Sequence, residues 1–412
     1  MAFENIWLFL GVMIAASGVV RLAPVLPERF RVPASIAVLL AFLCWAPFVL
    51  DDYRTPQLAR IGVWVVAAMG LNILTGYNGQ ISLGHGALVA LGAYTSALLM
   101  DSTEQMSFVD ATPWPFWITI IAAGGVTAVV GLVLSIPALR LSGPYLAIAT
   151  LALAISFPSI MKKYDGFTGG SAGIRLSPLQ PPDFLDGVLD RVDWLYFLAL
   201  VTSVLMLLLA WGILRGPLGR AFVAVRDSEV AAEAMGVSIA GTKVTAFTIS
   251  AFYAGVAGGL YIQLFSLVSP DAINLFQSIN LFAVIVIGGL ASMLGSVIGA
   301  AALVFLPSDA PDLVGRIPGL DVDVVERAPG AIQGALVILV ILLLPSGVAG
   351  FLHRLERLRP ADLVGQVKGG STAALARAGS ARERLSWLWA IRPWAHHLPR
   401  SPDNPDGGES GS

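Results

Sequence analysis

Long apolar runs, separated by short polar segments, dominate this chain from its start to about residue 350. A helix needs about 20 mostly apolar residues to cross a bilayer, and a charge at its centre costs about 2.5–3.5 kcal/mol on insertion scales. The charged residues gather between the runs, as membrane spans require. The pattern predicts eleven spanning helices, near 5–22, 33–50, 58–75, 80–100, 115–137, 142–160, 194–214, 246–268, 274–290, 294–307 and 330–350.

The runs 274–290 and 294–307 allow two interpretations. Gly288, Gly289 and Gly295 mark either a loop between two short spans or a break within one long helix, because glycine favours turns and also interrupts helices. The sequence leaves these alternatives open. The first run follows an acidic residue, Glu4, with no Lys or Arg before it, unlike a signal peptide, so we expect it to be a retained span.

Basic residues predict which loops lie in the cytoplasm, because loops rich in Lys and Arg stay on that side. They gather in the first loop, in the loop 215–245 and at the start of the tail, whereas the loops 101–114 and 308–329 are acidic or nearly so. With eleven spans, the N-terminus lies outside and the C-terminus in the cytoplasm. Lys162 and Lys163 fall on the outer side and run against the rule.

The composition supports a membrane protein and excludes one class of partner. Hydrophobic residues make up 56% of the 412 residues and charged residues only 13%, against roughly a quarter charged in soluble domains. The net charge of -2 argues against a nucleic-acid-binding face. Cys44 is the single cysteine, so an intrachain disulfide is impossible, and we expect it to be buried as a small apolar side chain.

The composition changes after residue 350, where Arg and Gly increase. The last dozen residues are too polar to fold, and we expect them to be disordered. Before them, Trp387, Trp389 and Trp394 lie among arginines. This pattern suits a helix on an anionic membrane surface, and it equally suits a short solvated helix with incidental aromatic residues.

The glycine-rich stretch 76–86, GYNGQISLGHG, predicts a break in a membrane helix, because each glycine costs about 0.8–1.0 kcal/mol in a helix relative to alanine. Helix breaks within the membrane occur only where the backbone faces protein or a water-filled cavity, and they often mark a transport site. We therefore expect Asn78, Gln80, Ser82 and His85 to line or brace a pathway. His85 either holds the break as a neutral imidazole or contacts the solute or gate directly.

A second cluster of candidate pathway residues lies at 143–151 and 167–174. Tyr145 and Thr150 follow Pro144, which suits the first turn of a helix. The loop with Thr168, Gly169 and Gly170 offers backbone amides that can meet a carboxylate, although it also reads as a plain turn.

A third cluster, at 219–236, predicts a short surface helix in the basic loop. Asp227 or Ser228 can cap a helix whose first turn holds Glu229, and Gly236 can end it in a left-handed conformation. Three apolar residues gather on one side of it, Val230, Ala234 and Met235. Such a helix either binds a partner or is a solvated linker.

These motifs together resemble the permeases of branched-chain amino acid ABC importers, LivM type, over roughly residues 60–350. The resemblance is carried by GQISLGHG at 79–86, GAY at 92–94, GPYLAIATL at 143–151, TGG at 168–170, the segment 219–236, KVTAF at 243–247, SAFYAGVAG at 250–258, the segment 287–295 and PSG at 345–347.

The family implies an all-α polytopic protein of about 10–11 transmembrane helices in the bacterial inner membrane, importing branched-chain or related hydrophobic amino acids. The implied partners are a second permease subunit in a heterodimer, two cytoplasmic ATPase subunits and an extracytoplasmic solute-binding protein. The chain is expected to bind no cofactor, metal or nucleic acid and to have no catalytic residue. ATP belongs to the partners, because Thr242 precedes Lys243 where a nucleotide-binding loop would need Gly-Lys-Ser/Thr.

The resemblance also assigns residues 231–236 to a coupling helix that docks into an ATPase cleft. The candidate ATPase-coupling residues are Arg226, Asp227, Glu229, Ala231, Ala232, Glu233, Gly236 and Lys243. The expected organisation is N-terminal spans at 1–57, a permease core at 58–350 with the coupling loop 215–245, and a cytoplasmic tail at 351–412.

Three alternatives remain beside this interpretation. Importers of urea or short amides share the same motifs. An intramembrane enzyme would need a nucleophile beside a base, for which Ser82 and His85 are the nearest candidates, and a passive channel would need no ATP. We expect selectivity to begin at the binding protein, since no buried acid or base is obviously placed to hold both ends of a zwitterion.

Overall fold

The computed structural model describes residues 11–13, 16, 28–51, 53–100, 114–141, 143–182, 189–315, 334, 338 and 347–350. The chain divides into two units, Met1–Leu352 and His353–Ser412, and every described residue belongs to the first. The expected tail at 351–412 and most of the first and last predicted spans lie outside the described residues, as do most of the loops 101–114 and 308–329.

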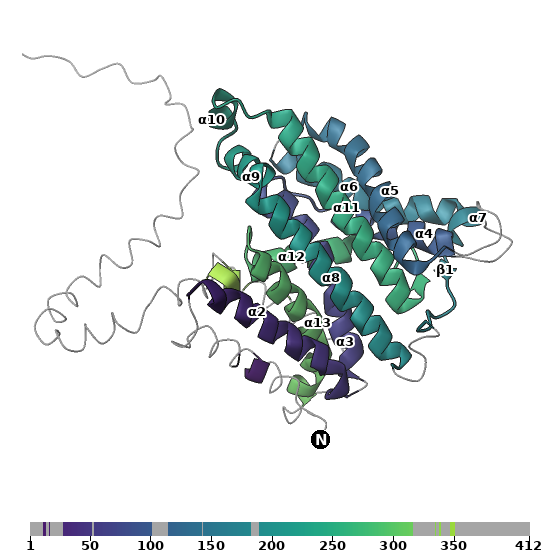
Figure 1. The fold of residues 1–412 in the computed structure, drawn as a ribbon. Helices are drawn as coiled ribbons and strands as arrows, with labels where there is room; N and C mark the ends of the chain where they lie inside the picture. The colour runs from purple at the N-terminus through teal and green to yellow at the C-terminus, as the bar shows by residue number, and fades with distance from the viewer. Residues whose placement is uncertain are drawn as a thin grey trace, which may run out of the picture. The chain divides into compact units, whose positions relative to one another are not determined.

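Helices make up nearly all of the described chain (Figure 1). The elements are α2 (Glu28–Trp45), a 3-10 turn (Ala46–Phe48), α3 (Arg54–Leu71) with a π-helical extension (Asn72–Tyr77), α4 (His85–Met100), α5 (Phe116–Ala138), α6 (Pro144–Lys163), α7 (Asp165–Thr168), β1 (Ile174–Arg175), α8 (Arg191–Arg215), α9 (Pro217–Asp227), α10 (Glu229–Ala234), α11 (Ile239–Phe265), β2 (Leu267–Val268), α12 (Leu275–Gly288) and α13 (Met293–Gly315).

The apolar runs correspond to these helices. Five of the described helices are long and apolar enough to cross a membrane, and four shorter apolar helices account for the runs near 33–50, 80–100, 274–290 and 294–307. The prediction of an all-α polytopic membrane protein is confirmed. Cys44 is an exception to the expected burial, because it is exposed on α2.

α3 and α11 form the centre of the helix packing. In their apolar stretches 89% and 72% of residues are buried, against 22% in α6 and in α8, which turn apolar side chains outward as a lipid-facing helix does. α11 packs most extensively against α5, α4 and α3. Small residues allow these backbones to come close, as is typical of membrane helix interfaces.

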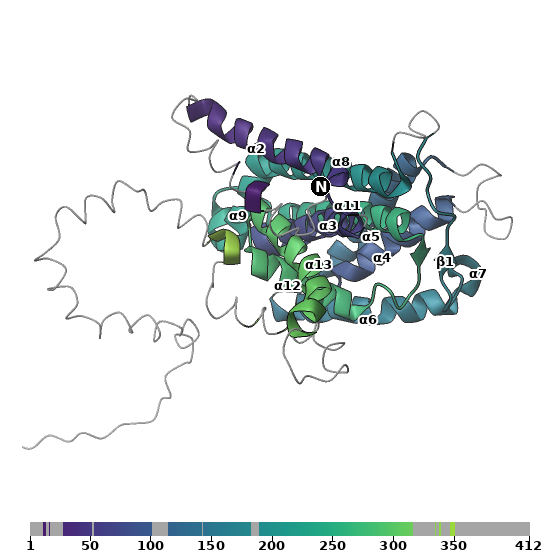
Figure 2. The same cartoon turned by 90° about the horizontal axis from the view of Figure 1, so that it is seen from below.

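The helices place two sets of connections at opposite ends. α9 and α10 lie beside the start of α11, whereas α7 and the two-residue strand β1 lie beside its other end (Figures 1 and 2). β1 pairs antiparallel with β2, which directly follows α11, with Ile174 opposite Val268. Lys162 lies at this second end and pairs with Asp271 at 2.8 Å, so its charge is balanced despite its unexpected side.

The structure settles the alternative left open for residues 274–307. α12 ends at Gly288 and α13 begins at Met293, and the two helices pack against each other. Gly289 and Ala291 in the connection have φ angles of 118° and 56°. The glycines therefore mark a tight loop between two short helices.

Candidate functional site

The helix break predicted at 76–86 is confirmed. The π-helical extension of α3 ends at Tyr77, and α4 begins only at His85. Between them the backbone turns back on α3, where the amides of Asn78 and Gln80 donate to the carbonyls of Ile73 and Leu74 at 3.1 and 3.0 Å. We refer to residues 78–84 as the break segment.

Hydrogen bonds to three other helices hold the break segment and the start of α4 in place. The hydroxyl of Thr150 on α6 accepts from the Leu83 amide at 2.9 Å, and that of Ser278 on α12 accepts from the Gly86 amide at 3.0 Å. The Gln80 side-chain amide donates to the Lys243 carbonyl on α11 at 3.1 Å. A Cβ on Gly84 would collide with the Thr150 carbonyl, so only glycine fits there.

Several buried polar atoms around the break have no hydrogen-bond partner in the described part of the chain. They are both amide atoms of Asn78, Oγ of Ser82, Nδ1 of His85 and Oγ of Ser250. A buried polar group without a hydrogen-bond partner costs about 1–3 kcal/mol of stability, so such groups commonly bind water or a ligand. The atoms therefore indicate where water or solute groups can be accommodated beside the break.

His85 combines features of both roles considered for it. Its Nε2 atom lies 3.0 Å from the Ala67 carbonyl on α3, a contact that braces the start of α4 against the central helix. Its ring is fully buried, and its Nδ1 atom is one of the unpaired atoms. Bracing is therefore visible in the geometry, and one ring nitrogen remains for a second contact.

Asn72 connects the π-helical extension to the α12–α13 loop, a role that the sequence analysis missed. Its amide nitrogen donates to the Ser292 carbonyl at 2.8 Å and to Ser296 Oγ at 2.9 Å, and its oxygen accepts from the Ala291 amide at 2.9 Å. The signal that could have found it is an asparagine inside the apolar run 58–75.

Replacing Asn72 by alanine is expected to lower the free energy of unfolding by about 3 kcal/mol, because three hydrogen bonds between α3 and the α12–α13 region are lost at once. Thermal unfolding of the purified protein in detergent, followed by helix content, measures the change. Thr95→Val is the matched control, since within the described ranges the Thr95 hydroxyl bonds only to the Leu91 carbonyl of its own helix. Equal stability of the two variants would contradict the proposed structural role of Asn72.

Three of the predicted ATPase-coupling residues, Arg226, Glu229 and Lys243, lie next to the break segment. Arg226 donates to the Gly76 carbonyl at 3.1 Å and pairs with Asp227 at 2.9 Å. Lys243 on α11 pairs with Glu229 on α10 at 2.8 Å. A cavity of about 80 Å³ is lined by residues of both groups: Asn78, Gln80, Arg226, Glu229 and Lys243 among others.

α10 is the short helix predicted in the basic loop. Ser228 caps its start, with Oγ accepting from the Ala231 amide at 3.2 Å. Gly236 ends it at φ 82°, and the Val237 amide donates to the Ala232 carbonyl at 3.0 Å, so the left-handed end is confirmed. Ala232 is buried and faces the protein, while Ala231 and Glu233 are exposed.

Two apolar side chains of this region face outward. Val230 is 80% exposed and Met235 is 84% exposed, on a segment far too polar to lie within the hydrocarbon region. Exposed apolar side chains at the tip of a well-formed turn are typical of a protein-binding surface.

Thr150 is the one of the remaining candidate pathway residues that contacts the break segment in the described structure; Tyr145, Thr168, Gly169 and Gly170 do not join this site. Thr150 lies in the first half of α6 and Thr168 beyond its end, so residues 151–163, about 20 Å of helix, separate them. The amides of Gly169 and Gly170 donate to the Asp165 carbonyl and to Thr168 Oγ1. Tyr145 is 69% exposed on the outside of α6.

Comparisons with known proteins identify the family of the chain. Residues 53–344 match the family model described as branched-chain amino acid transport system / permease component. The high-affinity branched-chain amino acid transport system permease proteins LivM of Salmonella typhimurium and of Escherichia coli are 33% and 32% identical over 290 residues, which cover 65% of this chain.

The matched part of the chain spans 66% of the length of each of these two relatives. The permease protein LivH of Salmonella typhimurium is 25% identical over 310 residues, covering 70% of this chain and 91% of the relative. No solved structure matches the chain. With the family model covering well over half of its residues, the chain belongs to the family of branched-chain amino acid transport system permease components.

Proposed function

We propose that this chain is a permease subunit of an ATP-driven importer in the bacterial inner membrane, and that it moves branched-chain or related hydrophobic amino acids. The two LivM relatives are named for high-affinity transport of these solutes. The relatives LivM and LivH, both similar to this chain, favour a second permease subunit as a partner. Two ATPase subunits and an extracytoplasmic binding protein complete the proposed complex.

The observation that carries the ATP-driven mechanism is the connection of α10 to the break segment through Lys243 on α11. Val230 and Met235 offer an ATPase partner an apolar contact, while Glu229 holds α10 to Lys243 on α11. Gln80 binds the carbonyl of that same Lys243, and Arg226 binds the carbonyl of Gly76. A movement of α10 imposed by the ATPase would thus be transmitted to Gly76, just before the break segment, and to Gln80 within it.

In this mechanism the permease core at 58–350 alternates its access. The loop 215–245 and the C-terminus lie in the cytoplasm, and the break segment lies at the cytoplasmic end of the pathway. Asn78, Ser82 and His85 supply the unpaired polar atoms there, while Thr150 braces the segment. The chain itself forms and breaks no covalent bond, and its partners hydrolyse ATP.

Solute uptake into proteoliposomes that contain the permeases, ATPases and binding protein tests the proposal. ATP-dependent uptake of leucine, isoleucine and valine is expected, with no uptake when ATP is omitted. Urea and acetamide serve as matched solutes for the alternative. Uptake of urea or acetamide without the amino acids would replace the proposed solute class, and amino acid uptake without ATP would indicate a passive channel.

A further inference from the structure

A second, larger cavity lies at the opposite end of the helices from α9 and α10. Its volume is about 600 Å³, within the range of about 300–1,000 Å³ that is usual for ligand pockets. It is formed by the first half of α3, the end of α11, the start of α12 and the middle of α13. In the proposed orientation this is the extracytoplasmic end, where a solute arrives.

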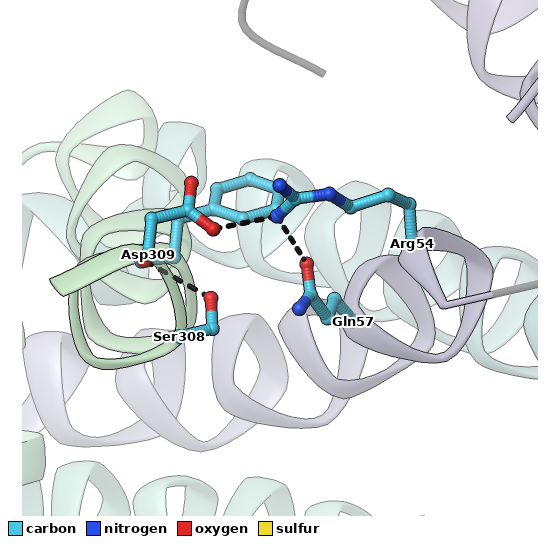
Figure 3. A network of polar contacts seen from close by, with 5 residues as sticks. Arg54, Gln57, Ser308 and Asp309 are labelled. Atoms are coloured by element: carbon cyan, nitrogen blue, oxygen red, sulfur yellow. Dashed lines mark hydrogen bonds and ion pairs between the residues drawn. The ribbon is translucent and has the colours of Figure 1, made fainter. Parts of the chain in front are cut away.

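Arg60 is the one charged side chain among the described residues that line this cavity. It is exposed, and no carboxylate pairs with it in the described ranges. The nearby acids already have cationic partners. Asp309 pairs with Arg54, which also donates to Gln57 (Figure 3), and Asp271 pairs with Lys162. Among the described residues, the positive charge of Arg60 at this cavity is therefore uncompensated.

Aromatic rings make up the wall beside Arg60. The guanidinium carbon lies 5.0 Å from the centroid of the Phe265 ring, which stacks on Tyr261 at 4.3 Å. Tyr261 in turn lies 6.1 Å from the ring of Trp64. Contact with Phe265 orients the guanidinium while leaving its N–H groups available, and the rings offer an apolar surface with faces that attract cations.

Gln277 adds a neutral polar group on α12. Its side-chain amide makes no hydrogen bond to the described residues, and it is only partly buried. An amide carbonyl can accept from an ammonium group, whereas arginine binds a carboxylate through two parallel hydrogen bonds. The cavity thus presents a cation, an acceptor and an apolar wall, three features that suit a zwitterion with an apolar side chain.

We infer that this cavity is a binding site for the amino acid solute on its way into the pathway, in which Arg60 binds the carboxylate. Trp64 and Tyr261 contact the apolar side chain, and Gln277 accepts from the ammonium group. The inference deepens the proposed function and rests on it for the identity of the solute. It also gives the membrane chain its own part in recognition, beyond the binding protein.

Protection of a cysteine from a thiol reagent tests occupancy without requiring transport. Ala272 lines the cavity, so Ala272→Cys in a Cys44→Ser background, assembled in the full complex, places the single reporter thiol of this chain there. Leucine is expected to slow labelling by a maleimide. Isocaproate, which keeps the carboxylate, should protect as well, whereas isoamylamine, which lacks it, should not.

Arg60→Gln is expected to raise the half-protecting leucine concentration about tenfold or more, because charge-assisted hydrogen bonds to the carboxylate are lost. Arg60→Lys should restore part of the effect. Arg175→Gln is the matched control, since Arg175 is an exposed arginine at the same end but does not line the cavity. Equal protection in the Arg60→Gln and Arg175→Gln variants, or protection by isoamylamine alone, would overturn the inference.

The same preparations separate this inference from the proposed function. If leucine uptake depends on ATP but leucine does not protect Ala272→Cys, the proposed importer function stands and the binding site in the cavity is rejected. A lipid that permanently occupies the cavity would lead to the same conclusion. If isocaproate protects in a way that depends on Arg60 but no branched-chain amino acid is taken up, the cavity is still a carboxylate-binding site and the proposed solute class is wrong.

Discussion

Replacing Val230 and Met235 together by aspartate is expected to prevent stable binding of the ATPase subunits and to abolish ATP-dependent uptake. Both side chains are more than three-quarters exposed, so their replacement should leave the fold of this chain intact. Burying one such side chain in an interface contributes about 1.5–3 kcal/mol, and two new carboxylates would have to be desolvated. The combined loss corresponds to an affinity at least about a hundredfold lower.

Co-purification of the ATPase subunits with the tagged permease measures this effect directly. Ala240→Asp is the control, because Ala240 is an exposed residue of the same region but belongs to the first turn of α11. It introduces one aspartate outside α10 and should leave association unchanged. Normal co-purification and uptake in the double variant would show that α10 is a solvated linker.

A valine at Gly92 is expected to prevent α4 from packing against α11 and so to prevent the protein from folding stably. An added Cβ at this position would lie 2.5 Å from both the Cα atom and the carbonyl oxygen of Gly255. The clash is with backbone, so no rotamer change can relieve it. Overpacking a buried site costs about 1–3 kcal/mol, and we expect this site to reach or exceed the upper value.

The fraction of purified chain that elutes as a single species in detergent, together with its thermal unfolding midpoint, measures the outcome. Gly125→Val is the matched control, because Gly125 is also a helical glycine but has no atom within 4 Å of an added Cβ. A midpoint for Gly92→Val equal to that of Gly125→Val would show that α4 and α11 are not held at the described distance.

The elements themselves could be predicted because each depends on residues that are neighbours in sequence. The lengths of apolar runs predict spanning helices, and four glycines within eleven residues predict the break before His85. Ser228 and Gly236 define the ends of α10 in the same local way. The expected burial of Cys44 was wrong, because membership in an apolar run does not tell which face of α2 packs inward.

The partners of the buried polar groups could not be predicted in this way. Asn72 and Ser292 are 220 positions apart, and their hydrogen bond depends on how α3 packs against the α12–α13 loop. Arg60 illustrates the same point, because in the sequence it is simply an arginine near the start of the predicted span 58–75. Only the packing of four helices turns it toward an aromatic cavity, which the residues near it in sequence do not reveal.

The sequence by itself therefore determined the membrane-spanning class, the family, the position of the helix break and the short helix after Ser228. Hydrophobic periodicity, glycine content and capping residues are local properties, so a single chain displays them directly. The tertiary structure decided which candidate residues act together. It joined the break segment to α10 through Lys243, and it separated Thr168 from Thr150 by residues 151–163 of α6. Such proximity follows from how closely small residues allow helices to pack, which no single segment specifies.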